Sequence, residues 1–193
     1  MKIFVSGTDL KRIMSVCKSC VATDEACEAR PVLGQIEIEC VKGEGRATSL
    51  DGFKMIQTRF SYTGDDGVML IPPISEINKD CEYEIEAEDG IVSFLGGGKE
   101  IIAKAYDGKF LNWRAIARKQ SKPAFKIACN PSYLKSVLNQ TGKAPIILEF
   151  YSELEGFFVK SKDTIGMILP VRVSPSFGDF IEFGSDAKKE NEA

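Results

Sequence analysis

The chain has 193 residues, of which 44% are hydrophobic, and its formal net charge is −3 at neutral pH. This length suits one large domain or two small ones, and no run of about 18 apolar residues is present to span a membrane. The absence of histidine excludes histidine triads, histidine bases and histidine metal ligands. The amino-terminal stretch MKIFVSG lacks the apolar core of a signal peptide, so we expect a cytoplasmic protein.

The first elements follow the order strand, helix, strands. Residues 2–7 read as a strand, and Thr8 is the expected cap of a helix over 8–21 with apolar residues at helical spacing. Residues 34–62 predict two or three strands with glycine-rich turns, one of them at Asp51-Gly52. Phe53 and Met55 lie beside this turn, where polar residues are usual. They either cover local core or form one wall of a docking site.

A second round of the same order begins at residues 68–72, which predict a strand. Pro72 and Pro73 are expected to open a short helix over 72–80, because proline suits the first turn of a helix. Three strands are then predicted between residues 81 and 106, and GGGK at 96–99 is interpreted as a hairpin turn because strands flank it on both sides.

A third round begins with a predicted strand at 124–129. Asn130 is the expected cap of a helix over 131–143 with Pro131 at its first position, and three strands follow. The element order therefore predicts an α+β fold of three β-α-β-β-β units. We expect a complete domain of two units, a linker, a half domain of one unit and a flexible tail, at residues 1–117, 118–123, 124–174 and 175–193 respectively.

Two patterns suggest chemistry but have simpler explanations. Cys17 and Cys20 form a C-x-x-C that, with Cys27 and Cys40, would supply four thiolates for zinc. Cys17 lies on the apolar stripe of its predicted helix and no second C-x-x-C follows, so we interpret the cysteines as structural and expect no metal or cofactor. The alternating glutamates of 82–88 predict a solvated strand face rather than an acid–base pair.

Basic residues concentrate in the predicted helices and linker. In the first helix, Asp9 is outnumbered by Lys11, Arg12 and Lys18, and the linker carries only basic charges. The predicted strands and tail are acidic overall. This distribution suits helices that face a phosphate backbone, and a chance partition of charge is the alternative explanation.

Several stretches resemble one family when they are taken in order. They are Arg30 to Leu33, Asp51-Gly52 with Lys54 and Met55, the segment 107–110 (DGKF), and the stretches NPSYLKSVLNQ and GMILPVRV. Over residues 1–173 they resemble the bacterial DNA polymerase III β subunit, the sliding clamp. The resemblance implies helices around a central hole, antiparallel sheets on the outer rim, and no catalysis. This chain departs from the family in having one and a half domains, Phe53 in place of a usual histidine, and Leu111 in place of a proline.

The resemblance also implies two sets of functional residues. Inner helices would contact double-stranded DNA without sequence preference, through Lys11, Arg12, Lys18, Lys135 and Lys143. A partner-peptide pocket would be walled by Leu33, Gly52, Phe53, Lys54, Met55, Met167, Leu169, Pro170, Val171 and Arg172.

Our leading hypothesis is a DNA sliding clamp, or processivity factor, that encircles duplex DNA and tethers replication or repair proteins. Its partners would be DNA polymerase, other clamp-binding peptides and a clamp loader. The family's ring of two chains contains twelve such units, so we expect a homo-oligomer, as a tetramer first and a dimer second. The alternatives are a regulatory decoy that never closes a ring, and a cysteine-dependent metal or redox protein. Because Phe177, Phe180 and Phe183 recur in the tail, we also expect it to dock in a pocket, with a disordered tail as the alternative.

Overall fold

A computed structural model describes residues 1–22, 25–106, 108–117 and 126–172. The chain divides into two compact units, residues 1–111 and 112–193, and each is described by itself. The predicted linker and the predicted tail with its three phenylalanines lie outside the described residues. Within the part of the chain that the structure describes, no helix is long and apolar enough to cross a membrane.

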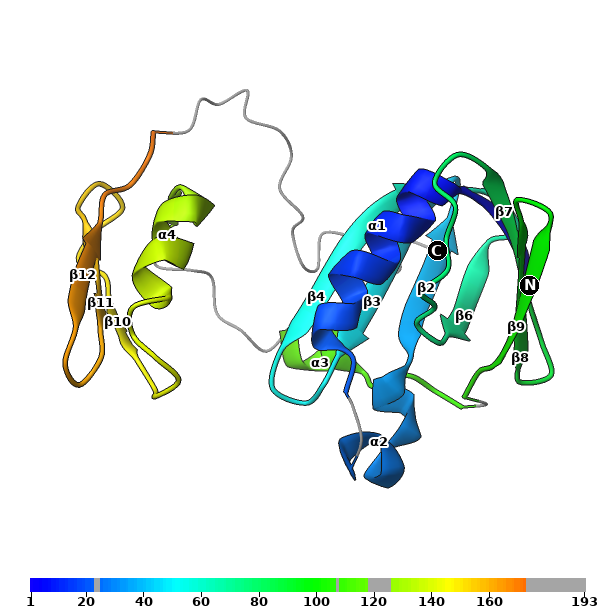
Figure 1. The fold of residues 1–193 in the computed structure, drawn as a ribbon, viewed down its shortest axis with the longest axis horizontal. Helices are drawn as coiled ribbons and strands as arrows, with labels where there is room; N and C mark the ends of the chain where they lie inside the picture. Colours follow the sequence, from blue (N-terminus) through cyan, green and yellow to red (C-terminus); the bar gives the residue numbers. More distant parts are fainter. Residues whose placement is uncertain (23–24, 107, 118–125, 173–193) are drawn as a thin grey trace, which may run out of the picture. The chain divides into compact units, whose positions relative to one another are not determined.

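In unit 1, helix α1 (Gly7–Cys17) packs across one face of a four-stranded antiparallel sheet (Figure 1). The sheet has the order β4-β3-β2-β6, with β2 (Ile36–Val41), β3 (Glu44–Leu50), β4 (Met55–Ser61) and β6 (Gly67–Ile71). The predicted apolar stripe of α1 is confirmed, because Leu10, Ile13, Met14 and Cys17 are all buried. Short turns of helix join α1 to β2, namely η1 (Lys18–Cys20), α2 (Glu25–Ala29) and η2 (Pro31–Gly34).

The second sheet of unit 1 has the order β5-β1-β7-β8-β9. Its strands are β1 (Lys2–Ser6), β5 (Thr63–Gly64), β7 (Glu82–Glu88), β8 (Ile91–Gly96) and β9 (Lys99–Lys104). The predicted hairpin turn at 96–99 is confirmed, with positive φ at Gly97 and Gly98. Side chains alternate along β7, so Tyr83 and Ile85 are buried while the glutamates face outward, and Lys2 pairs with two of them.

The two halves of unit 1 exchange their first strands. β1 precedes β2–β4 in the chain but pairs antiparallel with β7, and β6 precedes β7–β9 but pairs antiparallel with β2. The other edge of β1 pairs with β5, the short strand that follows β4. One core therefore contains residues of both halves, among them Ile3, Ile38, Ile71 and Ile85. Neither half covers its apolar face without the other.

The predicted cap of α1 is wrong by two residues. The hydroxyl of Ser6 accepts a hydrogen bond from the Asp9 amide at 3.0 Å, which makes Ser6 the N-cap. The Thr8 hydroxyl instead donates to the carbonyl oxygen of Lys79 at 3.2 Å. The Thr8 side chain, which the local sequence predicts as the cap, therefore bonds to a segment that is distant in the chain.

The predicted helix over 72–80 is not formed, because residues 72–78 are irregular and end in a turn. Pro73 disfavours the helical conformation of the residue before it, and the segment instead packs Ile74 and Ile77 against the core. Its carbonyl groups closely approach the start of α1. A Cβ atom on Gly7 would lie 2.1 Å from the Asn78 oxygen, so only glycine fits there without rearrangement.

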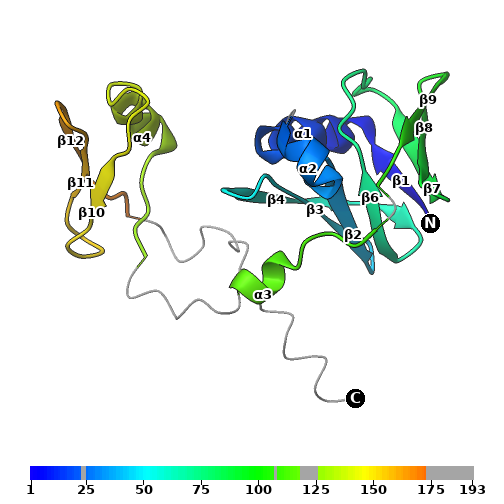
Figure 2. The same cartoon turned by 90° about the horizontal axis from the view of Figure 1, so that it is seen from below.

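Unit 2 contains α3 (Trp113–Ala117), α4 (Pro131–Leu138) and an antiparallel sheet of β10 (Ile147–Glu149), β11 (Phe157–Lys160) and β12 (Ile165–Ile168), in that order (Figures 1 and 2). The predicted cap is confirmed, since the Asn130 side chain accepts from the Ser132 amide at 2.9 Å. Phe157, Val159 and Ile168 form a small core against which α4 packs.

The predicted strand at 124–129 is not formed over its described residues, 126–129. A strand requires a neighbour along its edge, and these residues make only one backbone bond to such a neighbour, from the Val171 amide to the Ala128 oxygen at 2.8 Å. The corresponding strands of unit 1, β1 and β6, are each held by the sheet of the other half. The described residues of unit 2 contain a single such half, so no strand of a second half lies beside residues 126–129.

Candidate DNA-facing and peptide-docking surfaces

Two of the first three predicted DNA-binding residues, Lys11 and Arg12, lie on α1. This helix ends at Cys17 rather than at residue 21 as predicted, so Lys18 lies in η1, directly after it. Lys11 and Lys18 are exposed. The Arg12 guanidinium donates to the Thr58 hydroxyl and to the Arg59 carbonyl oxygen, each at 2.6 Å, and pairs with Asp9 at 2.6 Å. Arg12 therefore fastens α1 to β4, and a carboxylate already offsets its charge.

The remaining predicted DNA-binding residues lie in unit 2. Lys135 is exposed on α4. Lys143 is also exposed, but α4 ends at Leu138 rather than at residue 143 as predicted, so Lys143 lies in the turn after the helix. The five basic residues thus belong to two separate units, and their use as one DNA-facing surface remains a prediction.

The turn after β3 presents an aromatic side chain to solvent. The Asp51 carboxylate accepts hydrogen bonds from the amides of Phe53 and Lys54, both at 3.0 Å, and these bonds lower the pKa of Asp51. Gly52 takes a φ of 94°, which L side chains rarely adopt. Phe53 is 100% exposed, so the explanation that it covers local core is wrong.

The other predicted wall residues of unit 1 are less accessible. Lys54 donates to the Ser19 carbonyl oxygen at 2.7 Å and so ties the turn to η1, directly after α1. Met55 is partly buried, and Leu33 is only 5% exposed. Within unit 1, the surface available to a peptide is therefore mainly Phe53 with Gly52 and the stem of Lys54.

Unit 2 presents the second predicted wall as an apolar strip. Met167 is 55% exposed and Leu169 is 63% exposed, and both side chains lie over Gly156. Met167 pairs with Phe158 on the face of the sheet opposite the buried Ile168. Val171 and Arg172 continue the strip as exposed residues, and Pro170 is partly buried. The two predicted walls belong to separate units, so the pocket that would join them remains a prediction.

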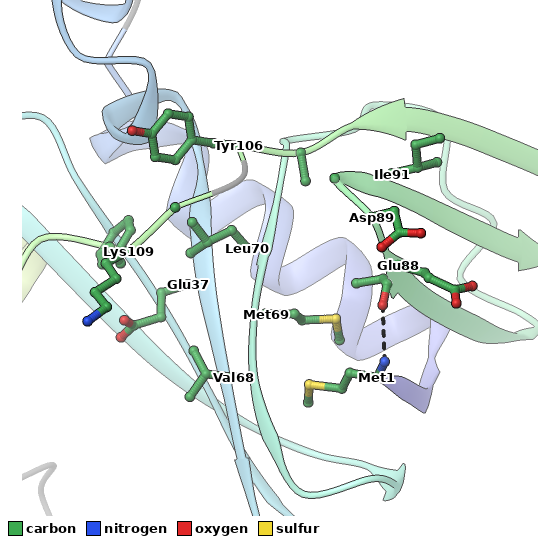
Figure 3. Close-up of a pocket in the computed structure, with 15 residues that line it drawn as sticks. Met1, Glu37, Val68, Met69, Leu70, Glu88, Asp89, Ile91, Tyr106 and Lys109 are labelled. Atoms are coloured by element: carbon green, nitrogen blue, oxygen red, sulfur yellow. Dashed lines mark hydrogen bonds between the residues drawn. The ribbon is translucent and has the colours of Figure 1, made fainter.

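A cavity of about 470 Å³ in unit 1 was not predicted from the sequence, although Lys109 and its two neighbours in the DGKF segment line it (Figure 3). The amino-terminal amine of Met1 lies beside it and donates to the Ala87 carbonyl oxygen at 3.0 Å. Glu37, Glu88 and Asp89 line it together with Lys109 and several apolar side chains. Both signs of charge are present, and none of the residues predicted for DNA or peptide binding lines this cavity.

The cysteines have the environment of structural thiols. Burial raises the pKa of the Cys17 thiol to about 11 and that of Cys40 to about 12, so both are protonated at neutral pH. All six cysteines are free of disulfides. The described residues contain no group of three or more cysteine, aspartate or glutamate side chains placed to hold a metal ion. These observations favour the structural interpretation of Cys17 and Cys20.

We expect native protein to expose only part of its thiols to a thiol reagent at pH 8. Cys27, Cys81 and Cys129 are partly exposed and should react, whereas Cys17, Cys20 and Cys40 are buried and should react only after denaturation.

Purified protein should contain no stoichiometric zinc or iron. Metal near one equivalent, lost together with folding upon chelation, would contradict the structural interpretation.

Comparisons with known proteins give matches at the level of structure. No family model matches the sequence, and no curated protein matches it. The C. crescentus β sliding clamp matches 87% of this chain with a TM-score of 0.68 and 14% identity. The Helicobacter pylori β clamp matches 88% with a TM-score of 0.62 and 16% identity. The Bartonella birtlesii DnaN sliding clamp matches 84% with a TM-score of 0.60 and 14% identity.

These matches define the class of fold. The chain has the α+β fold of DNA polymerase III β sliding clamps, with antiparallel sheets and helices packed on them, as the sequence resemblance predicted. The matched part covers 47–50% of each of these three clamps, so this chain spans about half their length. At this level of identity the comparison establishes the fold.

Proposed function

We propose that this protein is a non-catalytic clamp that encircles duplex DNA and tethers replication or repair proteins. The observation that supports the proposal is the sliding-clamp fold over more than four fifths of the chain. In such a protein, Lys11 on α1, Lys18 in η1 and Lys135 on α4 would contact phosphates without reading sequence. Arg12 would act mainly by holding α1 on its sheet.

The tethering part of the proposal uses the exposed apolar residues of both units. The C. crescentus clamp was crystallised with polyethylene glycol at a candidate β-motif tethering region, and the B. birtlesii clamp with griselimycin. In this chain, Phe53, Met167 and Leu169 would bind the apolar anchors of a partner peptide, and Lys54 and Arg172 would lie at the rim. Partners would include DNA polymerase and other clamp-binding peptides, with a clamp loader assembling the ring.

Encirclement requires several copies of this chain. The sequence predicts three β-α-β-β-β repeats, two of them in unit 1 and one in unit 2, where the family's ring needs twelve, so a tetramer is the first expectation and a dimer the second. A closed symmetric assembly would place the basic helices inward and leave the acidic strands outside. A decoy that only binds clamp partners would have no need of this assembly.

We expect retention on DNA to depend on DNA topology rather than on affinity alone. The protein would be assembled at low salt on a nicked circular plasmid and then separated from unbound protein by gel filtration at high salt, where electrostatic contacts are screened. A closed ring should remain on the circle and be lost after a restriction enzyme linearises it, and blocking the DNA ends should restore retention. Equal loss from circles and cut circles, together with a monomeric native mass, would favour the decoy.

A further inference from the structure

Helix α4 of unit 2 buries less of its surface than helix α1 of unit 1 does. α1 buries five residues, whereas α4 buries none, although Leu134, Val137 and Leu138 pack partly against the small core. Tyr133 on α4 is 60% exposed. Helices of globular proteins bury an apolar stripe, so unit 2 has apolar surface that its described residues do not cover.

Further exposed apolar residues lie on the same side of the sheet as α4. Leu148 of β10 pairs with the buried Val159, so both point to the face that α4 covers. Phe150 stacks on the buried Phe157 with ring centroids 4.9 Å apart. Leu148 and Phe150 are nevertheless 45% and 44% exposed. The uncovered surface therefore follows the β10 edge, which is free because β10 is the outermost strand.

Unit 1 shows what covers the equivalent edge. There, β2 of the first half pairs along its outer edge with β6, the first strand of the second half. In the same way, β7 of the second half pairs along its outer edge with β1, the first strand of the first half. β1 uses both its edges, pairing with β5 from its own half and with β7 from the other half. Two halves of similar topology are thus closed by a mutual exchange of strands.

Segment 126–129 of unit 2 occupies the position of β1 in its half but lacks the second partner that makes β1 a strand. Both precede a capped helix, with Ser6 and Asn130 as the caps. Counting back from these caps, Ile127 takes the place of the buried Ile3. The bond from the Val171 amide to the Ala128 oxygen reproduces the β5–β1 contact within one half. The other edge of 126–129 has no strand beside it in the described chain.

We propose that a second copy of this chain supplies the missing half of unit 2. Residues 126–129 of each protomer pair antiparallel with β10 of the other, about a two-fold axis, and the two α4 helices share one enlarged core. The partner must offer a free β10-type edge beside an apolar face, and unit 2 itself carries both. A two-fold arrangement closes two edges at once, which is why an identical copy fits.

The exchange in unit 1 also predicts a register. Ile3 lies opposite Ile85, and both are buried. By analogy, Ile127 lies opposite the partner subunit's Leu148 on the core side, and Ala128 lies opposite the partner subunit's Ile147 on the outer side. Met167 is on the outer face of the sheet, so this pairing leaves the proposed peptide strip accessible. The pairing requires no DNA, and its test is therefore separate from that of the clamp function.

Native mass of the full chain, measured without DNA over a wide concentration range, tests the pairing. We expect a dimer or a multiple of it for the wild type, and a loss of that association of at least tenfold for Leu148→Asp. The matched control is Ile147→Asp, the next residue on the same strand, which faces the opposite side and is 63% exposed. Circular dichroism confirms that each variant is folded. Equal effects of the two variants, or a wild-type monomer at every concentration, would overturn the proposal.

A cross-linking experiment tests the register without destabilising the chain. Under mild oxidation, Ala128→Cys/Ile147→Cys should give a disulfide-linked dimer in which peptide mapping finds the bond between residues 128 and 147. The control Ala128→Cys/Ile165→Cys places the second thiol on β12, at an equally exposed position of 63%, and should give no bond between residues 128 and 165. Absence of the 128–147 bond contradicts the pairing. Association that emerges only after residues 173–193 are deleted would assign the face to the chain's own tail and equally overturn it.

Discussion

Reversing one charge on α1 and one in the adjoining η1, as Lys11→Glu with Lys18→Glu, should lower the affinity for duplex DNA by roughly tenfold or more at moderate salt. Both side chains are exposed, Lys11 on the helix that we propose to face DNA and Lys18 directly after its end. Each lysine that neutralises a phosphate contributes about 0.9 to the slope of log affinity against log salt concentration. The variant should therefore lose about two units of that slope, for every DNA sequence tested. Fluorescence anisotropy at several salt concentrations measures both quantities.

The matched control reverses two other exposed lysines of unit 1. Lys99→Glu with Lys104→Glu changes the net charge by the same amount on β9, away from α1. If DNA sensed only the overall charge of the protein, the two double variants would weaken binding equally. That result would contradict the assignment of α1 as the DNA-facing helix. Arg12 is left unchanged, because its reversal would also break contacts with Thr58 and Asp9 and so destabilise unit 1.

Binding of a partner peptide should weaken when the apolar strip of unit 2 is truncated. For a peptide with a Gln-x-x-Leu-Phe-like anchor, we expect Met167→Ala and Leu169→Ala each to reduce the binding free energy by about 1–2 kcal/mol, since anchor pockets concentrate binding energy in few residues. Both side chains are more than half exposed, so their truncation should change the free energy of unfolding little. Isothermal titration and urea denaturation measure the two effects separately.

Two further variants make the peptide experiment specific. Phe53→Ala removes the fully exposed ring of the other proposed wall, and it should weaken the same peptide only if both units contact it. Ile165→Ala truncates another exposed residue of β12 outside the strip, so it should leave peptide affinity unchanged. If no such peptide binds the wild type, or if Ile165→Ala weakens binding as much as Leu169→Ala, the pocket assignment fails.

The sequence alone determined the features that depend on neighbouring residues. The apolar spacing of α1, the Asn130 cap of α4, the glycine turn between β8 and β9 and the alternation along β7 all follow from periods and caps that act over a few residues. The order of these elements and the quoted motifs were sufficient to predict the clamp fold, which the structural matches confirm.

The tertiary structure decided what depends on partners distant in the chain. Residues 72–80 carry a helix-start signal but pack irregularly against the start of α1, and Arg12 carries a charge suited to DNA but binds Thr58 and Asp9. Residues 126–129 have a strand-like sequence but no second strand beside them in the described chain, whereas β1 has two. A helix satisfies its backbone within itself, but a strand exists only with a neighbour, so its formation follows from the topology of the whole assembly.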